Sequence, residues 1–451
     1  MRKILCIQLG RTGLFLGDSF WTALRDDHGL KHPGKYPSFP KPRRFGTIAK
    51  REAYKKELEK YRKKRSRYLF GINTFFDGQD ELWYTPRALL VDTDPTMRDN
   101  ASNFAVPPTL ENWITGNGDA DANWAKGYYS RGPELIDQIV AAAEKPALEN
   151  GFAGVILFHS LGGGTGSGLG TLLLERLRAG GKFRTIATVS VLPSTRMQEN
   201  VLEPYNAVLG LSKIAKLADL CFLVDNEALR NLAATLMHAA DPTYPEMNMV
   251  AGRILTDVAR LISGIGLPRL AGYLLPEPWM NLISISAARF HPQDTSLDPR
   301  DLLQQAFSVH NGLVAFPSEA GKALVRSLFF RGSLNHNTAM KELRRLQDQL
   351  PPPFPDWPSN YMVPHFQTLG PTGLKNNLTM VSNHTGVKTA LIRLLGEFDQ
   401  LYRKRRHVAS YTSQGMRETE FLEAVDAIRD LIQAYQQIEA QQVDRDEDEA
   451  K

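Results

Sequence analysis

One run of residues has a composition suited to holding an anion: residues 162–168 read Gly-Gly-Gly-Thr-Gly-Ser-Gly. Glycines let the backbone approach a ligand closely with its N–H groups turned inward. The hydroxyls of Thr165 and Ser167 add donors, and a helix beginning directly afterwards would add the positive end of its dipole. We therefore expect phosphate to contact Gly162, Gly163, Gly164, Thr165, Gly166 and Ser167.

The neighbours of this run indicate a folded loop and not a linker. An apolar segment, residues 155–160, precedes it, and a segment with helical periodicity, residues 169–177, follows it. No Lys follows the last glycine, and no register fits Gly-x-Gly-x-x-Gly. The sequence of this loop therefore does not favour a Walker-type NTPase or a dinucleotide oxidoreductase.

Short apolar segments alternate with helical patterns through the first half of the chain. This alternation predicts an α/β fold with a parallel sheet buried on both faces, whose ligands bind beyond the carboxyl ends of the strands. The predicted strands are residues 4–9, 88–91, 154–158, 185–192 and 220–224.

The second half begins with an apolar stripe at helical spacing from Thr243 onward, with Pro245 in the first turn, which predicts a long buried helix. Mixed strands and helices follow, with a proline-rich surface loop at residues 351–358. Residues 386–441 predict two amphipathic helices separated near residues 412–415.

Composition and charge are those of an ordinary globular protein of 451 residues. No segment approaches the roughly 20 apolar residues that span a bilayer, and the first residues are too short for a signal peptide. Cys6 and Cys221 lie in apolar runs, which indicates buried thiols and a reducing cytoplasm.

Charge is concentrated in two places. Residues 31–67 contain fifteen Lys and Arg and three Glu, whereas the last residues are acidic, with Asp444, Asp446, Glu447, Asp448 and Glu449. Residues 50–67 could form a basic helix with a weak apolar stripe at Tyr54, Leu58 and Tyr61. Three interpretations remain open: a solvated surface helix, a dock for an acidic partner, or a surface for nucleic acid or membranes.

Several segments resemble tubulins and their relative FtsZ, in the same order along nearly the whole chain. They are Gln8-Leu9-Gly10 with Gly13 and Gly17, residues 87–92, residues 123–127, residues 159–170, Glu203-Pro204-Tyr205-Asn206, residues 225–229, and Pro242-Thr243-Tyr244. The paired C-terminal helices and acidic tail are similar to tubulin more than to FtsZ. The degree of divergence resembles that of delta, epsilon, zeta or microbial tubulins.

This resemblance implies a tubulin-like domain order. We expect a GTP-binding parallel-sheet domain over residues 1–243, which includes the basic insert 31–67, and a central helix over residues 244–265. An intermediate α+β domain would span residues 266–385, antiparallel C-terminal helices residues 386–441, and the acidic tail residues 442–451.

For the nucleoside half of a GTP or GDP site, the resemblance implies that the family's residues are kept. Glu203 would reach the ribose, Asn226 and Asn248 would read the guanine edge, and Tyr244 would stack on the ring. An amide side chain presents both a donor and an acceptor, as discrimination of guanine requires.

The phosphate half departs from the family. Tubulins usually have Gln-Cys-Gly-Asn-Gln after the first glycine, whereas this chain continues from Gly10 with Arg11, Thr12, Gly13, Leu14 and Phe15. Arg11 could pair with phosphate or replace the charge of a metal. The Asn that contacts phosphate in the family is Ala122 here.

Acidic residues remain in the phosphate half. Asp92 and Asp94 match the family's acidic loop near the γ-phosphate and its metal, so Mg²⁺ could accompany the nucleotide there, and Asp119 fits a further acidic position.

Hydrolysis in the family is completed by an acid on the loop after the central helix, which reaches the nucleotide of the next subunit. Arg269 stands at that position, and Gly266 stands where FtsZ-like members have Asp. A guanidinium is not a general base at neutral pH, so no catalytic acid is assigned and GTP hydrolysis should be weak or depend on a partner subunit.

The resemblance thus implies a cytoplasmic, cytoskeletal subunit of microtubule-like filaments, which contacts itself or other tubulins longitudinally. Residues 291–298, where tubulins contact neighbouring protofilaments, look short. The alternative is a non-polymerising scaffold with locked or lost nucleotide that recruits an acidic partner. We expect no membrane span and no nucleic-acid partner.

Overall fold

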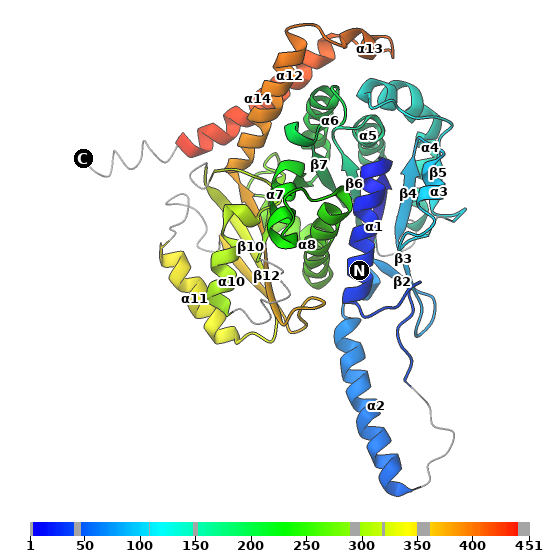
Figure 1. Ribbon diagram of the computed structural model, residues 1–451, viewed down its shortest axis with the longest axis vertical. Helices are drawn as coiled ribbons and strands as arrows, with labels where there is room; N and C mark the ends of the chain where they lie inside the picture. Colours follow the sequence, from blue (N-terminus) through cyan, green and yellow to red (C-terminus); the bar gives the residue numbers. More distant parts are fainter. Residues whose placement is uncertain are drawn as a thin grey trace, which may run out of the picture.

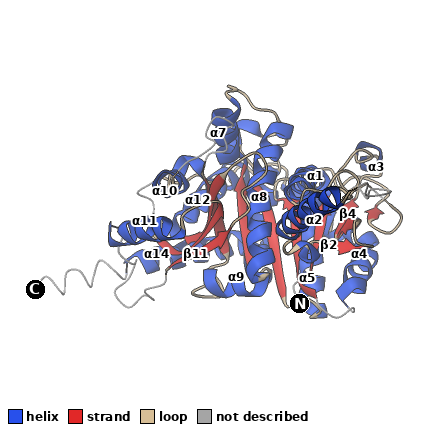
Figure 2. Cartoon of the chain, turned by 90° about the horizontal axis from the view of Figure 1, so that it is seen from below, coloured by secondary structure: helices blue, strands red, loops and turns tan. Residues whose placement is uncertain are grey.

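A ten-stranded sheet with helices on both faces forms the centre of the molecule (Figures 1 and 2). The computed structural model describes residues 3–39, 47–107, 109–147, 152–288, 298–317, 321–349 and 361–440. The expectations for the 351–358 loop, the 442–451 tail and nearly all of the 291–298 segment concern residues outside these ranges.

The first seven strands of the sheet pair in parallel, as predicted, in the order β5-β4-β1-β6-β7-β8-β9. Their bounds are β1 Lys3–Leu9, β4 Ala88–Asp92, β5 Trp113–Thr115, β6 Phe152–Ser160, β7 Thr185–Leu192, β8 Leu220–Asp225 and β9 Leu282–Ala287. The carboxyl ends of these parallel strands therefore lie along one edge of the sheet.

Beyond β9 the pairing becomes mixed, which gives the α+β character of the second half. β12 (Asn376–His384) is antiparallel to both β9 and β10 (Ala323–Gly332), and β11 (Met362–Gln367) is parallel to β10. A separate hairpin joins β2 (Phe76–Gly78) to β3 (Tyr84–Pro86).

The helices follow the predicted pattern, and the long apolar stripe forms α8, which begins at Tyr244 with a capping box between Thr243 and Glu246. Their bounds are α1 Gly10–Asp27, α2 Ile48–Tyr68, α3 Met97–Asn100, α4 Gly132–Ala147, α5 Gly170–Gly180, α6 Glu203–Leu217, α7 Asn226–Met237, α8 Tyr244–Ile265, α9 Leu267–Leu274, α10 Pro299–Ala306, α11 His336–Gln349, α12 Lys388–Tyr402, α13 Val408–Thr412 and α14 Thr419–Ala440.

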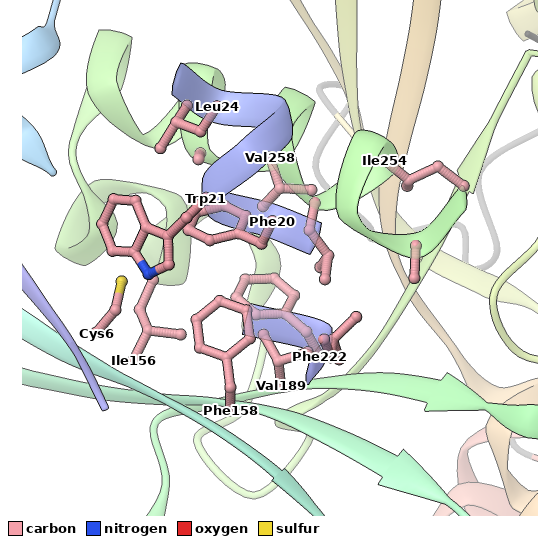
Figure 3. Close-up of a cluster of buried hydrophobic side chains, with 14 of the residues drawn as sticks. Cys6, Phe20, Trp21, Leu24, Ile156, Phe158, Val189, Phe222, Ile254 and Val258 are labelled. Carbon is pink, nitrogen blue, oxygen red and sulfur yellow. The ribbon is translucent and has the colours of Figure 1, made fainter. Parts of the chain in front are cut away.

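Alternate residues of the central strands enter two separate hydrophobic clusters, because successive side chains of a strand point to opposite faces. In β1, Ile4 and Cys6 join the cluster under α1 and α8, whereas Leu5 and Ile7 join the cluster under α4, α5 and α6. Figure 3 shows the first cluster, in which aromatic rings of α1 lie against the sheet. Both cysteines are free and buried, as predicted.

The C-terminal helices differ from the prediction in one respect. The expected break at residues 412–415 is present, but α12 already ends at Tyr402, and the short helix α13 lies between α12 and α14. The intervening basic turn contains two residues with positive φ, Arg405 and His407, which end the helix. α12 and α14 still form a packed pair, at the top of Figure 1.

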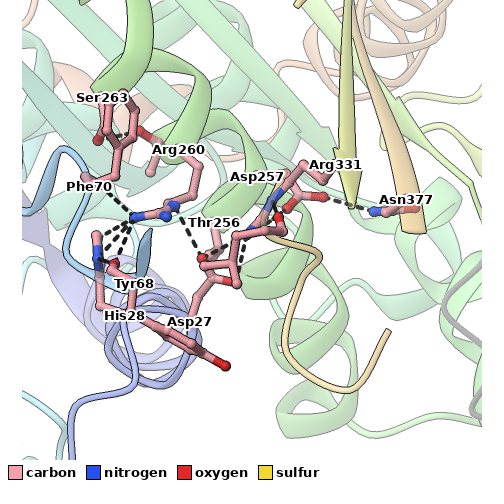
Figure 4. Close-up of polar contacts among 12 residues, drawn as sticks. Asp27, His28, Tyr68, Phe70, Thr256, Asp257, Arg260, Ser263, Arg331 and Asn377 are labelled. Carbon is pink, nitrogen blue, oxygen red and sulfur yellow. Dashed lines mark hydrogen bonds and ion pairs between the residues drawn. The ribbon is translucent and has the colours of Figure 1, made fainter. Parts of the chain in front are cut away.

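A buried ionic network connects the two halves of the chain (Figure 4). Arg331 of β10 donates to both carboxylate oxygens of Asp27 at 2.9 Å and to Asp257 of α8 at 2.5 Å. Asn377 and Thr379 donate to the other oxygen of Asp257, at 2.8 and 2.7 Å. Removing one partner of such a network typically costs about 3–5 kcal/mol, so α1, α8 and the second half of the sheet are held in one arrangement.

Helix α2 projects away from the body (Figure 1), and none of its residues is fully buried. Its predicted weak stripe is present: Tyr54 and Tyr61 contact the ring of Phe39, and Tyr61 donates to the carbonyl of Pro37 at 2.8 Å. In the described residues, no helix has the length and apolar character needed to cross a bilayer.

Candidate functional site

The glycine-rich run leaves β6 at the carboxyl edge of the sheet and forms a π-helical turn, η3 (Thr165–Leu169), that leads into α5. A methyl group on Gly164 would lie 2.6 Å from the amide nitrogen of Asn123, and one on Gly166 would lie 2.5 Å from the carbonyl oxygen of Ser160. By contrast, nothing lies within 4 Å of the same position on Gly163. The loop is therefore packed tightly behind and open at Gly163, as a phosphate cradle must be.

Hydrogen bonds fix this loop to its neighbours. The hydroxyls of Thr165 and Thr93 lie 2.6 Å apart, which ties the loop to the turn after β4. The carbonyl of Gly166 lies 2.7 Å from Nδ1 of the buried His159, and burial lowers the pKa of His159 to about 4, so this imidazole is neutral and donates. Sequence analysis missed Thr93 and His159 as supports of the loop.

Asp92, Asp94 and Asp119 are brought together at this edge. Burial, together with the nearby carboxylates of Asp94 and Asp119, raises the pKa of Asp92 to about 7, and the hydrogen bond from the Asp94 N–H opposes this shift. One carboxylate oxygen of Asp92 is buried without a hydrogen bond in the described structure. Such an oxygen fits a cation, since Mg²⁺ takes one or two carboxylates together with phosphate oxygens and water.

No cluster of three or more His, Cys, Asp or Glu that could hold a metal alone occurs in the described part of the chain.

Gly10, Arg11 and Thr12 form the first turn of α1, opposite the glycine-rich loop. Gly10 has φ +71°, and a methyl group there would lie 3.2 Å from the amide nitrogen of Gly166. The guanidinium of Arg11 is exposed and pairs with no other described residue. Phe15 packs edge-on against Phe104, with ring centroids 5.3 Å apart, and so takes part in the core.

Asn206 organises the phosphate half, although sequence analysis noted it only as part of a motif. Its amide nitrogen donates to the carbonyls of Gly162 and Ala122, at 2.7 and 2.6 Å. Its amide oxygen accepts from the backbone of Trp124 and from the hydroxyl of Tyr411, at 2.8 and 2.6 Å. Its position three residues after Glu203, on the same helix, was the available signal.

The residues predicted to hold the nucleoside lie in the first turns of α6, α7 and α8. Glu203, which lies against Gly162, accepts from the backbone N–H groups of residues 199 and 200, at 3.0 and 3.2 Å. Tyr244 lies close to Glu203 and donates to the carbonyl of Met197 at 3.2 Å. Asn248 is one helical turn beyond Tyr244 and so on the same side of α8.

The two predicted base-reading amides share one property. Neither the side chain of Asn226 nor that of Asn248 hydrogen-bonds to another described residue, and both are partly accessible. Amides in this state can exchange water for the edge of a base.

Comparison with known proteins agrees with this geometry. The Tubulin/FtsZ family GTPase domain matches residues 3–234, which contain every site residue named above except those of α8 and the C-terminal helices. The tubulin C-terminal domain matches residues 283–395. The protein is a member of the tubulin superfamily.

Its full length aligns with curated tubulins. The chain is 30% identical to the tubulin beta-6 chain of Gallus gallus and to the tubulin beta chain of Candida albicans, with 99% of this chain and 97% of each relative covered. It is therefore a divergent tubulin-superfamily member, and this membership implies guanine-nucleotide binding.

The predicted nucleoside half is also connected to the C-terminal helices. Arg393 of α12 pairs with both carboxylate oxygens of Asp225, at 3.0 and 3.1 Å, and Asp225 caps α7 by accepting from the N–H of Glu227. Asn226 thus follows a residue fixed by an ion pair to an outer helix, which holds the start of α7 in place.

Arg269 lies far along the chain from these residues, on the exposed face of α9. Its Nε donates to the hydroxyl of Tyr273 at 2.8 Å, and its guanidinium lies over the same ring, 5.5 Å from the centroid. The side chain is therefore held by a neighbour one turn away and presents a positive charge at the surface.

Proposed function

We propose that this tubulin is a guanine-nucleotide-binding cytoskeletal subunit that stacks head to tail into protofilaments with itself or with other tubulins, in the cytoplasm. The observation that carries the proposal is that the amides of Asn226 and Asn248 pair with no other described residue, while the glycine-rich loop leaves its backbone open at Gly163. Among the residues predicted to hold a nucleotide, the side chains of Arg11, Asn226 and Asn248 make no hydrogen bond to another described residue. Those of Thr165, Ser167, Glu203 and Tyr244 already have partners within the chain.

In the proposed binding mode, the phosphates lie on the N–H groups of the glycine-rich loop and Gly10. Arg11 supplies a further positive charge, and Asp92 with Asp94 would hold Mg²⁺. Bound there, Mg²⁺ would neutralise phosphate charge during hydrolysis. Glu203, Tyr244, Asn226 and Asn248 would hold the ribose and guanine.

Hydrolysis should be weak in filaments of this chain alone. In the family's mode of stacking, α9 would face the nucleotide of the next subunit, where Arg269 can stabilise negative charge but cannot accept a proton from water. A partner subunit with an acid at this position would restore turnover. Arg269→Glu should therefore raise phosphate release in pelleted polymer, and Arg269→Gln should not.

The first experiment is to identify by chromatography the nucleotide released on denaturation, and then to compare pelleting in GTP and in GDP. Released guanine nucleotide and GTP-dependent pelleting would support the proposal. Pelleting to the same extent in GTP and in GDP, or the absence of any bound nucleotide, would refute it.

The rival function is a non-polymerising scaffold that uses α2 to recruit an acidic partner. The projection of α2, with ten Lys and Arg against three Glu, favours it. Salt-sensitive binding to acidic peptides, together with no sedimentation in GTP, would replace our proposal with this one.

A further inference from the structure

A second site lies in the other half of the molecule, between the sheet and the helices α10 and α11, which Figure 1 shows side by side with β10 and β12. It is a cavity of about 640 Å³, within the size range of small-molecule sites. Its floor comes from β9, β10 and β12, and its walls come from the two helices.

The floor of this cavity breaks the pattern of the strands that form it. Along β10, residues 328 and 330 are apolar and join the hydrophobic cluster beneath α10 and α11, but the next position on the same face is Arg326. On β12, Met380 is likewise followed on that face by Ser382 and His384. The face is apolar at one end and polar at the end that lines the cavity.

Arg326 is a half-buried cation without a counter-charge in the described residues. Its guanidinium lies 4.9 Å from the ring centroid of Phe307, and it makes no hydrogen bond or ion pair to a described residue. Burial lowers the pKa of Arg326 to about 10, so the group stays charged at neutral pH. Removing a charge from water without a partner is costly, so an anionic ligand that pairs with this partly desolvated guanidinium would be favoured.

His384 adds a neutral donor beside it. The N–H of Gly386 donates to Nδ1 at 2.9 Å, and burial, with the nearby charges of Arg326 and Lys388, lowers the pKa of the imidazole to about 3. The ring proton is therefore on Nε2. Phe316 stacks on the ring, with centroids 4.6 Å apart, and fixes its orientation.

Positive charge also surrounds the mouth of the cavity. Arg300 and Arg345 line it and are exposed, and Glu342, whose carboxylate lies 4.0 Å from Arg345, is the acid among the lining residues. Leu303, Phe307 and Leu346 give the walls an apolar surface. The lining thus combines a half-buried cation, a neutral donor and apolar walls.

We propose that this cavity binds a small amphipathic anion, whose carboxylate or phosphate pairs with Arg326 and whose apolar body lies between β10, β12 and the helices α10 and α11. A guanidinium binds either anion with paired N–H donors, so the head group is left to experiment. The site is separate from the nucleotide site and does not depend on the proposed function.

Isothermal titration calorimetry on the full chain tests the site, with decanoate, decyl phosphate and decanol below their micellar concentrations, and with inorganic phosphate. We expect one equivalent of a decyl anion to bind, and decanol and inorganic phosphate to bind at least ten times more weakly. The tighter of the two anions identifies the head group. Binding of decanol as tight as that of the anions, or no binding of either anion, would overturn the proposal.

Variants locate the binding. Arg326→Val should weaken the anion at least tenfold and Arg326→Lys much less, whereas Arg344→Val, on α11 but not among the lining residues, should have no effect. If Arg326→Val does not fold, Leu346→Trp, which fills the cavity from α11, should abolish binding and leave GTP binding unchanged. Unchanged anion affinity in Leu346→Trp would place the ligand elsewhere.

Discussion

The two predicted halves of the nucleotide site differ in how many hydrogen bonds their residues make within the chain. In the predicted nucleoside half, the side chains of Asn226 and Asn248 hydrogen-bond to no other described residue. In the predicted phosphate half, Asn206, Thr93 and His159 hold the loop through internal hydrogen bonds, and the resemblance predicts that Arg11 and Ala122 stand in place of the family's amides. Binding specificity can therefore be kept while the phosphate chemistry changes.

The largest effect should come from the packed side of the loop. Gly164→Ala would place a methyl group 2.6 Å from the Asn123 nitrogen, and overpacking of this kind costs about 1–3 kcal/mol. We expect a lower melting temperature and at least a hundredfold loss of GTP affinity. Gly163→Ala is the matched control: it should melt like the wild type without nucleotide, but lose GTP if phosphate occupies the open position. Equal behaviour of the two variants would contradict the cradle.

The next effect tests the nucleoside half. Asn226→Ala should weaken GTP about 10- to 100-fold, since a lost hydrogen bond to a base is worth about 1–3 kcal/mol. It should also abolish the preference for GTP over ITP in competition binding. Asn231→Ala, on an exposed part of the same helix, should change neither. A preference for GTP that survives in Asn226→Ala would remove this residue from base recognition.

A pH effect follows from Asp92, whose pKa is about 7 in the folded chain and about 4 when unfolded. Between these values the folded state holds a proton that the unfolded state has lost. The contribution of Asp92 to the free energy of unfolding of the nucleotide-free protein is therefore greatest below pH 4. It falls as the pH rises to 7, by up to roughly 1.4 kcal/mol per pH unit. Asp92→Asn should flatten this dependence in denaturant titrations from pH 5 to 8; an unchanged slope would contradict it.

A smaller effect separates Arg11 from the metal. If the guanidinium supplies part of the cation charge, chelation of Mg²⁺ should weaken GTP about tenfold more in Arg11→Gln than in the wild type, because a charge-assisted bond is worth about 1.5–3 kcal/mol. Equilibrium binding with and without EDTA measures this, with the exposed Arg403→Gln as control. The same loss in all three proteins would show that Arg11 does not replace the metal.

The smallest effect concerns Ala122, which has φ +49°. This left-handed conformation costs a non-glycine residue about 1–2 kcal/mol, and Asn tolerates it better. Ala122→Asn should raise the melting temperature slightly and could return the family's phosphate contact, whereas Ala122→Val should lower it. A less stable Asn variant would show that the turn is relaxed around alanine.

Much of the fold was predictable, because the spacing of apolar residues in the strands and in the stripe from Tyr244 to Ile265 indicates the secondary structure directly. Local motifs also located the glycine-rich loop, whereas the base-reading roles of Asn226 and Asn248 stay predictions. Contacts between distant segments were not predictable: nothing in the sequence pairs Arg393 with Asp225, or Arg331 with Asp27 and Asp257. The early end of α12 was missed because it depends on two unusual backbone conformations, which the amphipathic pattern does not record.

The length of the projecting helix α2 determines how far its free end lies from the charges of the body. A helix of 21 residues is about 30 Å long, whereas charges in physiological salt are screened over about 8 Å. The free end of α2, which begins at its cap Thr47, therefore lies beyond the electrostatic influence of the body. The lysines and arginines near this end are therefore screened from the charges of the body, so a contact made there would leave the rest of the molecule's surface free.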